Sequence, residues 1–204
     1  MTTAVATPRQ RTTAESGLIA GSIAVFFWGI GPLLVRAMGV SAPTVVVFRF
    51  LLGTPAIVAV SYLLGGRFSN QLFKRALLPG ALFGVSLIVG FTAVLETSVA
   101  NATLINNMLP VLVLLIARFV MHEHVRGRQY VAVAAAVVGL AIVVFGAGSS
   151  GDASLWGDFL AVVNLLIWTW YFLRTKRLRD SGADSWSLIA TITVVAAAVA
   201  VPIC

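Results

Sequence analysis

The sequence predicts an all-α membrane protein, a polytopic bundle in which seven helices cross the bilayer. Hydrophobic residues make up 59% of the chain and charged residues only 10%, whereas soluble domains carry about 25% charged residues. The mean hydropathy is +0.99. The apolar residues also gather in long uncharged runs, which are separated by short segments that hold most of the charge. This arrangement is typical of membrane-spanning segments and their connections.

Seven apolar runs are long enough to span a bilayer, because a hydrocarbon core of roughly 30 Å needs about 20 mostly apolar residues. Each span must be helical, since a backbone amide in hydrocarbon has no water to bond and must bond within its own segment. Residues 1–17 are polar and are expected to form a short cytoplasmic tail that is retained. The expected spans are 18–38, 44–64, 76–96, 100–120, 129–147, 156–174 and 186–203.

Lysine and arginine fall on one side of these spans. All but two of the 14 basic residues lie in the N-terminal tail or around the connections after spans two, four and six. Cytoplasmic loops carry an excess of Lys and Arg, so the N-terminus is predicted to be cytoplasmic and Cys204 to face outward. The same flanking role explains the net charge of +7 better than nucleic-acid binding does, and no nucleic-acid partner is expected.

Spans one and six resemble each other at an offset of 140 residues. Gly17 corresponds to Gly157, Trp28 to Trp168 and Arg36 to Lys176. Two tandem units of five helices have opposite orientations in the membrane, because five is odd. Inverted repeats of this kind are common in secondary transporters, where the substrate site lies at the interface between the repeats.

Four features recur in a fixed order along the first five spans. They are Trp28-Gly29 in span one, Arg49 in span two, Pro110 in span four and Glu123 just after it. In this order and spacing the chain resembles the EamA-like proteins of the drug/metabolite transporter superfamily. The resemblance implies a fold of ten helices, built as two inverted five-helix repeats around a central cavity, and the transport of small metabolites.

On this resemblance the chain divides into one whole repeat and part of another. Residues 18–147 are expected to form the first five-helix repeat, 148–155 an external loop, and 156–204 the first two helices of the second repeat. Three helices of the second repeat would then be missing. The chain is therefore expected to be truncated at its C-terminus and not to transport as a lone monomer.

Span four places polar residues on one helical face, because Thr103, Asn106, Asn107 and Pro110 are spaced i, i+3, i+4 and i+7. An asparagine facing lipid would leave its amide unpaired at a cost of several kcal/mol. This face therefore points at protein or water, as a set of interhelical hydrogen bonds or as the wall of a solute cavity. Pro110 favours the cavity, since a proline leaves a carbonyl unbonded about one turn earlier.

Four more residues are candidates for the same cavity, and each has a plainer alternative. Arg49 either extends to the interface or faces a water-filled cavity. Trp28 lies beside Gly and Pro residues that could expose backbone to a solute or simply kink the helix. Trp168 and Asn164 come from span six, where Trp168 is expected to lie deeper than Tyr171, which suits an interfacial belt.

Two other patterns have structural interpretations. The Gly80-x-x-x-Gly84 motif in span three predicts close helix packing. His122 and His124 flank Glu123 but lack the i, i+4 spacing of a chelating pair. No metal site is expected. The chain has no phosphate-binding Gly-rich loop with a following Lys, so no nucleotide or other cofactor is expected.

The sequence thus predicts a secondary transporter in the plasma or inner membrane, with lipids and a small organic metabolite or drug as its partners. Alternating access is the expected mechanism and export the expected direction. An intramembrane enzyme would need a buried acid–base pair or nucleophile, which the spans lack. A third class, a non-transporting fragment or a pairing partner in a homo- or heterodimer, remains open.

The predicted orientation can be tested at Cys204, which is the only cysteine of the chain. A membrane-impermeant maleimide should label this thiol on intact cells, because the end of span seven is predicted to face outward. Labelling is followed by a gel shift, with lysed cells as the control for reactivity. If the thiol reacts only after lysis, the predicted topology is wrong.

Overall fold

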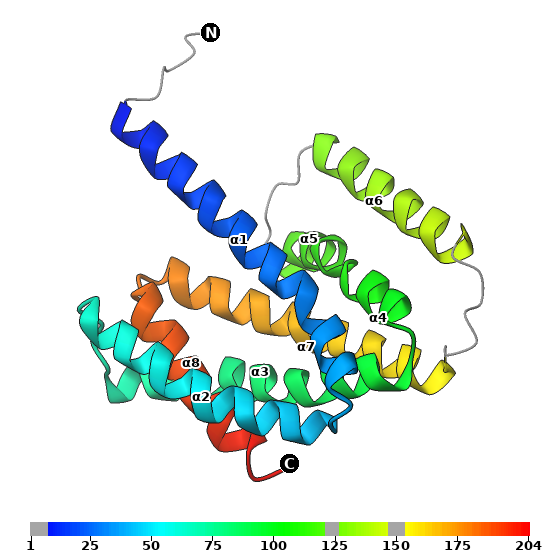
Figure 1. The fold of residues 1–204 in the computed structure, drawn as a ribbon. Helices are drawn as coiled ribbons and strands as arrows, with labels where there is room; N and C mark the ends of the chain where they lie inside the picture. The colour runs from blue at the N-terminus through cyan, green and yellow to red at the C-terminus, as the bar shows by residue number, and fades with distance from the viewer. Residues whose placement is uncertain (1–7, 121–126, 147–153) are drawn as a thin grey trace, which may run out of the picture. The chain divides into compact units, whose positions relative to one another are not determined.

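The structure is a computed structural model that describes residues 8–120, 127–146 and 154–204. Every regular element in these ranges is a helix, which confirms the predicted all-α class. The chain divides into one unit that ends at Gly39 and a second that begins at Val40. Figure 1 labels the helices α1 (Pro8–Met38), α2 (Ala42–Leu63), α3 (Asn70–Glu96), α4 (Val99–Asn106), α5 (Leu109–Val120), α6 (Gly127–Gly146), α7 (Leu155–Asp180) and α8 (Ser185–Ala200).

Four helices are long and apolar enough to cross a membrane within the described residues: Leu18–Met38, Ala42–Leu63, Asn70–Glu96 and Leu155–Asp180. Two shorter apolar helices, Val99–Leu114 and Ser185–Ala200, accompany them. They agree with six of the seven predicted spans, and α6 covers most of the remaining one. The predicted span 100–120 differs because it is divided into α4 and α5 by a turn at 107–108.

Helix α1 alone forms the regular part of the first unit. It stays helical through Pro32, so the Gly and Pro residues near Trp28 do not break it. Gly39 then ends the helix with a φ of 64°, a conformation that glycine adopts without a steric cost.

Polar residues fix where the helices of the second unit begin. The side chains of Ser69, Ser98, Ser154 and Asp184 each accept a hydrogen bond from a backbone N–H three residues later. These bonds satisfy amide groups that have no partner within the helix. Helices α3 and α7 also extend beyond their predicted spans at one end, because their first or last turns continue into the polar connections.

Helix α3 is the centre of the second unit. Both α7 and α8 pack on it, although these two helices follow one another in the chain, and α2 covers α8 and part of α3 (Figure 1). Val46, Phe50, Leu87, Ala196 and Ala200 form one apolar cluster where α2, α3 and α8 meet. A second cluster joins α3 to α8 nearer the start of α3. The predicted second-repeat helices α7 and α8 therefore pack directly on a helix of the first repeat.

Small residues bring α3 and α8 into direct backbone contact. A Cβ atom added at Gly80 would lie 2.5 Å from the Cβ of Val195, and one at Gly84 would lie 2.7 Å from the carbonyl oxygen of Ala196. Both distances are shorter than van der Waals contact. The close packing predicted from the Gly80-x-x-x-Gly84 motif is therefore confirmed.

The Gly84→Ala variant should lower the thermal unfolding temperature in detergent, because its new methyl group would displace the α8 backbone. Overpacking of this kind costs about 1–3 kcal/mol. Gly53→Ala is the matched control, since Gly53 lies in α2 and a Cβ there meets no atom within 4 Å. Replacing a helical glycine in open space is neutral or stabilising. Equal unfolding temperatures for the two variants would contradict the close approach.

Candidate functional site

Two predicted cavity residues from opposite halves of the chain meet in the interior. The Nδ2 of Asn164 on α7 donates a hydrogen bond of 3.0 Å to the Oδ1 of Asn106 on α4. Asn106 in turn donates from its Nδ2 to the carbonyl oxygen of Ala102, at 2.8 Å. Asn164 is 3% exposed. The structure therefore joins the polar face of span four to span six through one amide pair.

The Oδ1 of Asn164 is buried and has no hydrogen-bond partner. The two amide orientations explain why. The Nδ2 of Asn106 donates to the Ala102 carbonyl and its Oδ1 accepts from the Nδ2 of Asn164, so the atom that Asn164 directs at Asn106 is its nitrogen and not its oxygen. Its Oδ1 is left as an acceptor in the interior, and an unpaired polar atom of this kind is costly.

Helix α3 leaves room for this amide. A Cβ at Gly90 would lie 2.9 Å from the Nδ2 of Asn164 and 3.2 Å from its Oδ1. Any larger residue at position 90 would push against Asn164. Gly90 was not singled out from the sequence, because a lone glycine in an apolar span gives no sign of what it faces.

The chain between α4 and α5 turns beside this pair. Asn107 ends α4, and its N–H bonds to the Thr103 carbonyl, while the N–H of Met108 bonds to the Ile105 carbonyl. Pro110 has no N–H, so it cannot bond the carbonyl of Asn106. The predicted break near Asn106 is present. It also means that the four polar residues of span four do not share one continuous helical face.

The other predicted residues of span four lie around this turn. Thr103 donates to the Val99 carbonyl within α4, and its side chain is exposed. Asn107 and Pro110 are exposed as well. Of the polar residues predicted there, Asn106 alone has its side chain bonded to another helix among the printed contacts of the described residues.

Trp168 lies in an aromatic cluster between α2, α3 and α7. Its ring is 5.8 Å from that of Phe83 and 5.2 Å from that of Tyr171, measured between centroids. Phe83 also stacks on Tyr171 at 5.3 Å and meets Phe50 edge-on at 6.1 Å. Tyr171 therefore packs against α3, and its expected place in an interfacial belt stays a prediction. Trp168 is one helical turn from Asn164 along α7.

Arg49 and Trp28 are the two remaining predicted residues, and they belong to different units of the chain. The guanidinium of Arg49 on α2 lies 5.8 Å from the centre of the Phe91 ring on α3, a cation–π contact. Arg49 lies at an exposed position of α2. Trp28 on α1 is 58% exposed. His122, Glu123 and His124 lie outside the described residues.

A polar cluster at one end of α7 was missed in the sequence. The carboxylate of Asp158 accepts a hydrogen bond of 2.7 Å from the Thr97 hydroxyl and bonds of 3.3 Å from the Asn101 amide. Ser154 donates to the Glu96 carbonyl, and a Cβ at Gly157 would lie 2.6 Å from the carbonyl carbon of Glu96. These contacts hold the α3–α4 junction against the start of α7. We call them the α7 N-terminal cluster.

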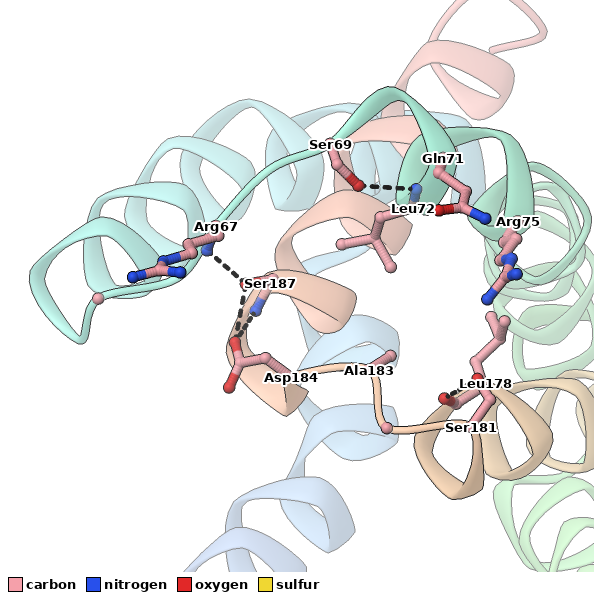
Figure 2. Close-up of a pocket in the computed structure, with 12 residues that line it drawn as sticks. Arg67, Ser69, Gln71, Leu72, Arg75, Leu178, Ser181, Ala183, Asp184 and Ser187 are labelled. Atoms are coloured by element: carbon pink, nitrogen blue, oxygen red, sulfur yellow. Dashed lines mark hydrogen bonds between the residues drawn. The ribbon is translucent and has the colours of Figure 1, made fainter.

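The opposite ends of α3 and α7 enclose a cavity of about 560 Å³ (Figure 2). It lies between the turn from α2 to α3 and the turn from α7 to α8. Ser187 joins the two turns, since its Oγ accepts from the N–H of Arg67 at 2.8 Å and donates to Asp184 at 2.7 Å. The hydrogen bonds from the Ser187 backbone and hydroxyl hold the pKa of Asp184 below its usual range. None of the predicted cavity residues lines this opening.

The α7 N-terminal cluster should show energetic coupling in a double-mutant cycle. Asp158→Ala and Thr97→Val each remove one partner of the same hydrogen bond, so their effects should overlap by about 1 kcal/mol. Unfolding of purified protein in mixed micelles measures each variant and the double variant. Asp158→Ala with Thr193→Val is the control pair, because Thr193 bonds within α8. Strictly additive effects for Asp158 and Thr97 would contradict this contact.

The sequence of the chain matches one known protein family over most of these helices. The sequence matches the EamA-like transporter family over residues 15–145, which run from α1 into α6. No curated protein is matched by the chain. The match includes Arg49, Asn106 and Pro110, whereas Asn164 and the rest of α7 and α8 lie beyond it. Because the match covers more than half of its residues, the chain belongs to the EamA-like transporter family and is an integral membrane protein of the drug/metabolite transporter type.

Proposed function

We propose that this protein is a secondary transporter that exports small organic metabolites or drugs by alternating access, with its solute site at Asn106 and Asn164. The carrying observation is the amide pair between α4 and α7, in which Asn164 is buried and has one unused acceptor. Polar groups inside a membrane protein are costly and are usually functional. A solute that donates a hydrogen bond would satisfy the Oδ1 of Asn164.

The surroundings of the pair favour a solute site over a purely structural bond. The turn at 107–108 leaves the Asn106 carbonyl without the usual helical donor, because Pro110 has no N–H. Trp168, one turn further along α7, and Phe83 of α3 supply flat apolar surfaces. Interrupted helices with polar backbone groups are where secondary transporters bind their solutes. A planar solute with an N–H or O–H donor fits these groups best.

Alternating access requires two ends that open in turn. The α7 N-terminal cluster closes one end through hydrogen bonds, whereas the other end holds the cavity of about 560 Å³. Two arginines, Arg67 and Arg75, line that cavity together with one acid, Asp184. By the positive-inside rule the cavity end is cytoplasmic. The structure would then correspond to a state closed toward the outside.

The solute site can be tested with Asn106→Ala and Asn164→Ala in proteoliposomes. The transported solute is first identified from a panel of amino acids, nucleobases and cationic drugs. Its flux should fall about tenfold or more in each variant, because losing a hydrogen bond between uncharged groups and leaving its partner unpaired costs roughly 1.5 kcal/mol. Both variants should remain monodisperse in detergent.

Thr193→Val is the matched control, because it removes a buried hydroxyl whose bond stays within α8. Its flux should equal that of the wild type. If the asparagine variants fail to accumulate while Thr193→Val accumulates normally, the pair is structural and the proposed site is wrong. Because the chain is not expected to transport as a lone monomer, the liposomes hold it at a density that allows two copies to pair. Absence of saturable flux for the unaltered protein across the panel would then contradict the transporter proposal itself.

A further inference from the structure

A second hollow adjoins the cavity of Figure 2 and lies on the exposed surface of α3 and α7. Its volume is about 450 Å³, and it is lined by Arg75, Leu78, Pro79, Arg174, Arg177, Leu178 and Ser181. Arg75, Leu178 and Ser181 line both spaces. Figure 2 shows the Arg75 side chain extending from α3 toward Leu178 and Ser181 at the end of α7. We call this second space the arginine hollow.

Three arginines from two helices border the arginine hollow. Arg75 comes from the second turn of α3, while Arg174 and Arg177 lie three residues apart near the end of α7 and so share one face of that helix. All three side chains are exposed. Its lining among the described residues includes no carboxylate, and the Ser181 hydroxyl is the only uncharged polar side chain in that lining. The lining side chains therefore carry three positive charges.

The ligand chemistry that suits such a set is a phosphate. A guanidinium presents its N–H groups as a planar fork that matches two oxygens of a phosphate. Arginines from two facing helices can bind one phosphate from both sides. A carboxylate has too few oxygen atoms to engage three guanidinium groups equally well.

Apolar residues show where the rest of the ligand would lie. Leu78 and Pro79 belong to the same hollow, and Leu77 and Leu78 are each 47% exposed. These residues continue from Arg75 into the apolar part of α3, which is long enough to span the bilayer. A ligand with a phosphate at one end and an acyl chain at the other would cover both parts. Free phosphate would leave the leucine surface uncovered.

We propose that the arginine hollow is a binding site for an anionic phospholipid, with the headgroup phosphate held by Arg75, Arg174 and Arg177 and an acyl chain lying along Leu77 and Leu78. Basic pockets between membrane helices bind anionic headgroups in this way. Because Arg75 and Ser181 also line the cavity of Figure 2, a bound lipid would hold α3 and α7 together beside its opening. This site is independent of the proposed solute site, which lies nearer the other end of α7.

The test is native mass spectrometry of the whole protein, delipidated and then mixed with equal amounts of phosphatidylglycerol and phosphatidylcholine. The wild type should retain one phosphatidylglycerol molecule in preference to phosphatidylcholine. Arg75→Gln and Arg174→Gln should each weaken that binding about tenfold, as expected for one lost charge-assisted contact. Lys74→Gln and Arg179→Gln are the matched controls, because each removes one positive charge at the same end but lines neither space.

Thermal unfolding provides a second readout, which does not require the protein–lipid complex to survive in the gas phase. Added phosphatidylglycerol should raise the unfolding temperature of the wild type and of both controls, but not that of Arg75→Gln. Stabilisation by inorganic phosphate equal to that by phosphatidylglycerol would overturn the lipid assignment in favour of a soluble phosphate ligand. Equal losses in all four variants would also overturn the proposal, since binding would then follow net charge alone. If the arginine variants fail to fold, the competition of phosphatidylglycerol against phosphatidylcholine for the wild type tests the proposal alone. Equal binding of the two lipids would then overturn the proposed site.

Discussion

The second unit depends on the close approach of α3 to the two helices at the end of the chain. Glycine makes this possible at four points: Gly80 and Gly84 lie against α8, Gly90 lies against Asn164, and Gly157 lies against the end of α3. Lipid tails are as apolar as leucine, so helices in a bilayer gain little from apolar burial and associate through tight packing and hydrogen bonds. The approach at Gly90 and Gly157 also brings polar groups of α7 within bonding distance of α3 and α4. The close approach of the helices at these glycines therefore allows both the tight packing and the polar contacts.

As a consequence, the two faces of α3 make different kinds of contact. Toward α2 and α8 the contacts are apolar, through Val46, Phe50, Leu87 and small alanines. On the side of α4 and α7, the end of α3 bonds to α7 through Thr97 and the Glu96 carbonyl. The amide pair of Asn106 and Asn164 then joins α4 to α7 beside it. Polar groups in a low-dielectric interior are costly when unpaired, so their pairing fixes the register of α7 against α4 more narrowly than apolar packing does. The first face holds the unit together, and the second lies beside the groups of the proposed solute site.

Much of this could be predicted from the sequence. Long uncharged runs defined the helices, because a bilayer leaves the backbone no alternative. The spacing of Gly80 and Gly84 predicted close packing, and the cost of burying Asn106 predicted that it would face protein or water. The partner of Asn106 was harder to predict, because Asn164 is 58 residues away and only the tertiary fold brings the two together. Asp158 was missed for a similar reason, since one acid near a helix start resembles an ordinary interfacial charge. The orientation in the membrane and the division into repeats stay predictions.

The polar contacts of α7 also bear on how the protein could change state. The α7 N-terminal cluster and the Asn106–Asn164 bond together involve only a few hydrogen bonds, each of which contributes about 0.5–1.5 kcal/mol net. Breaking them would cost a few kcal/mol, which is the range that separates two populated conformations of one protein. Separating α3 from α8 would instead expose a continuous apolar and glycine-lined contact. An opening at the α7 N-terminal cluster would therefore separate the start of α7 from the α3–α4 junction and leave α3, α8 and α2 together. In the proposed mechanism, a solute bound to the Oδ1 of Asn164 would favour the state that keeps this oxygen paired, and this difference would couple solute binding to the movement.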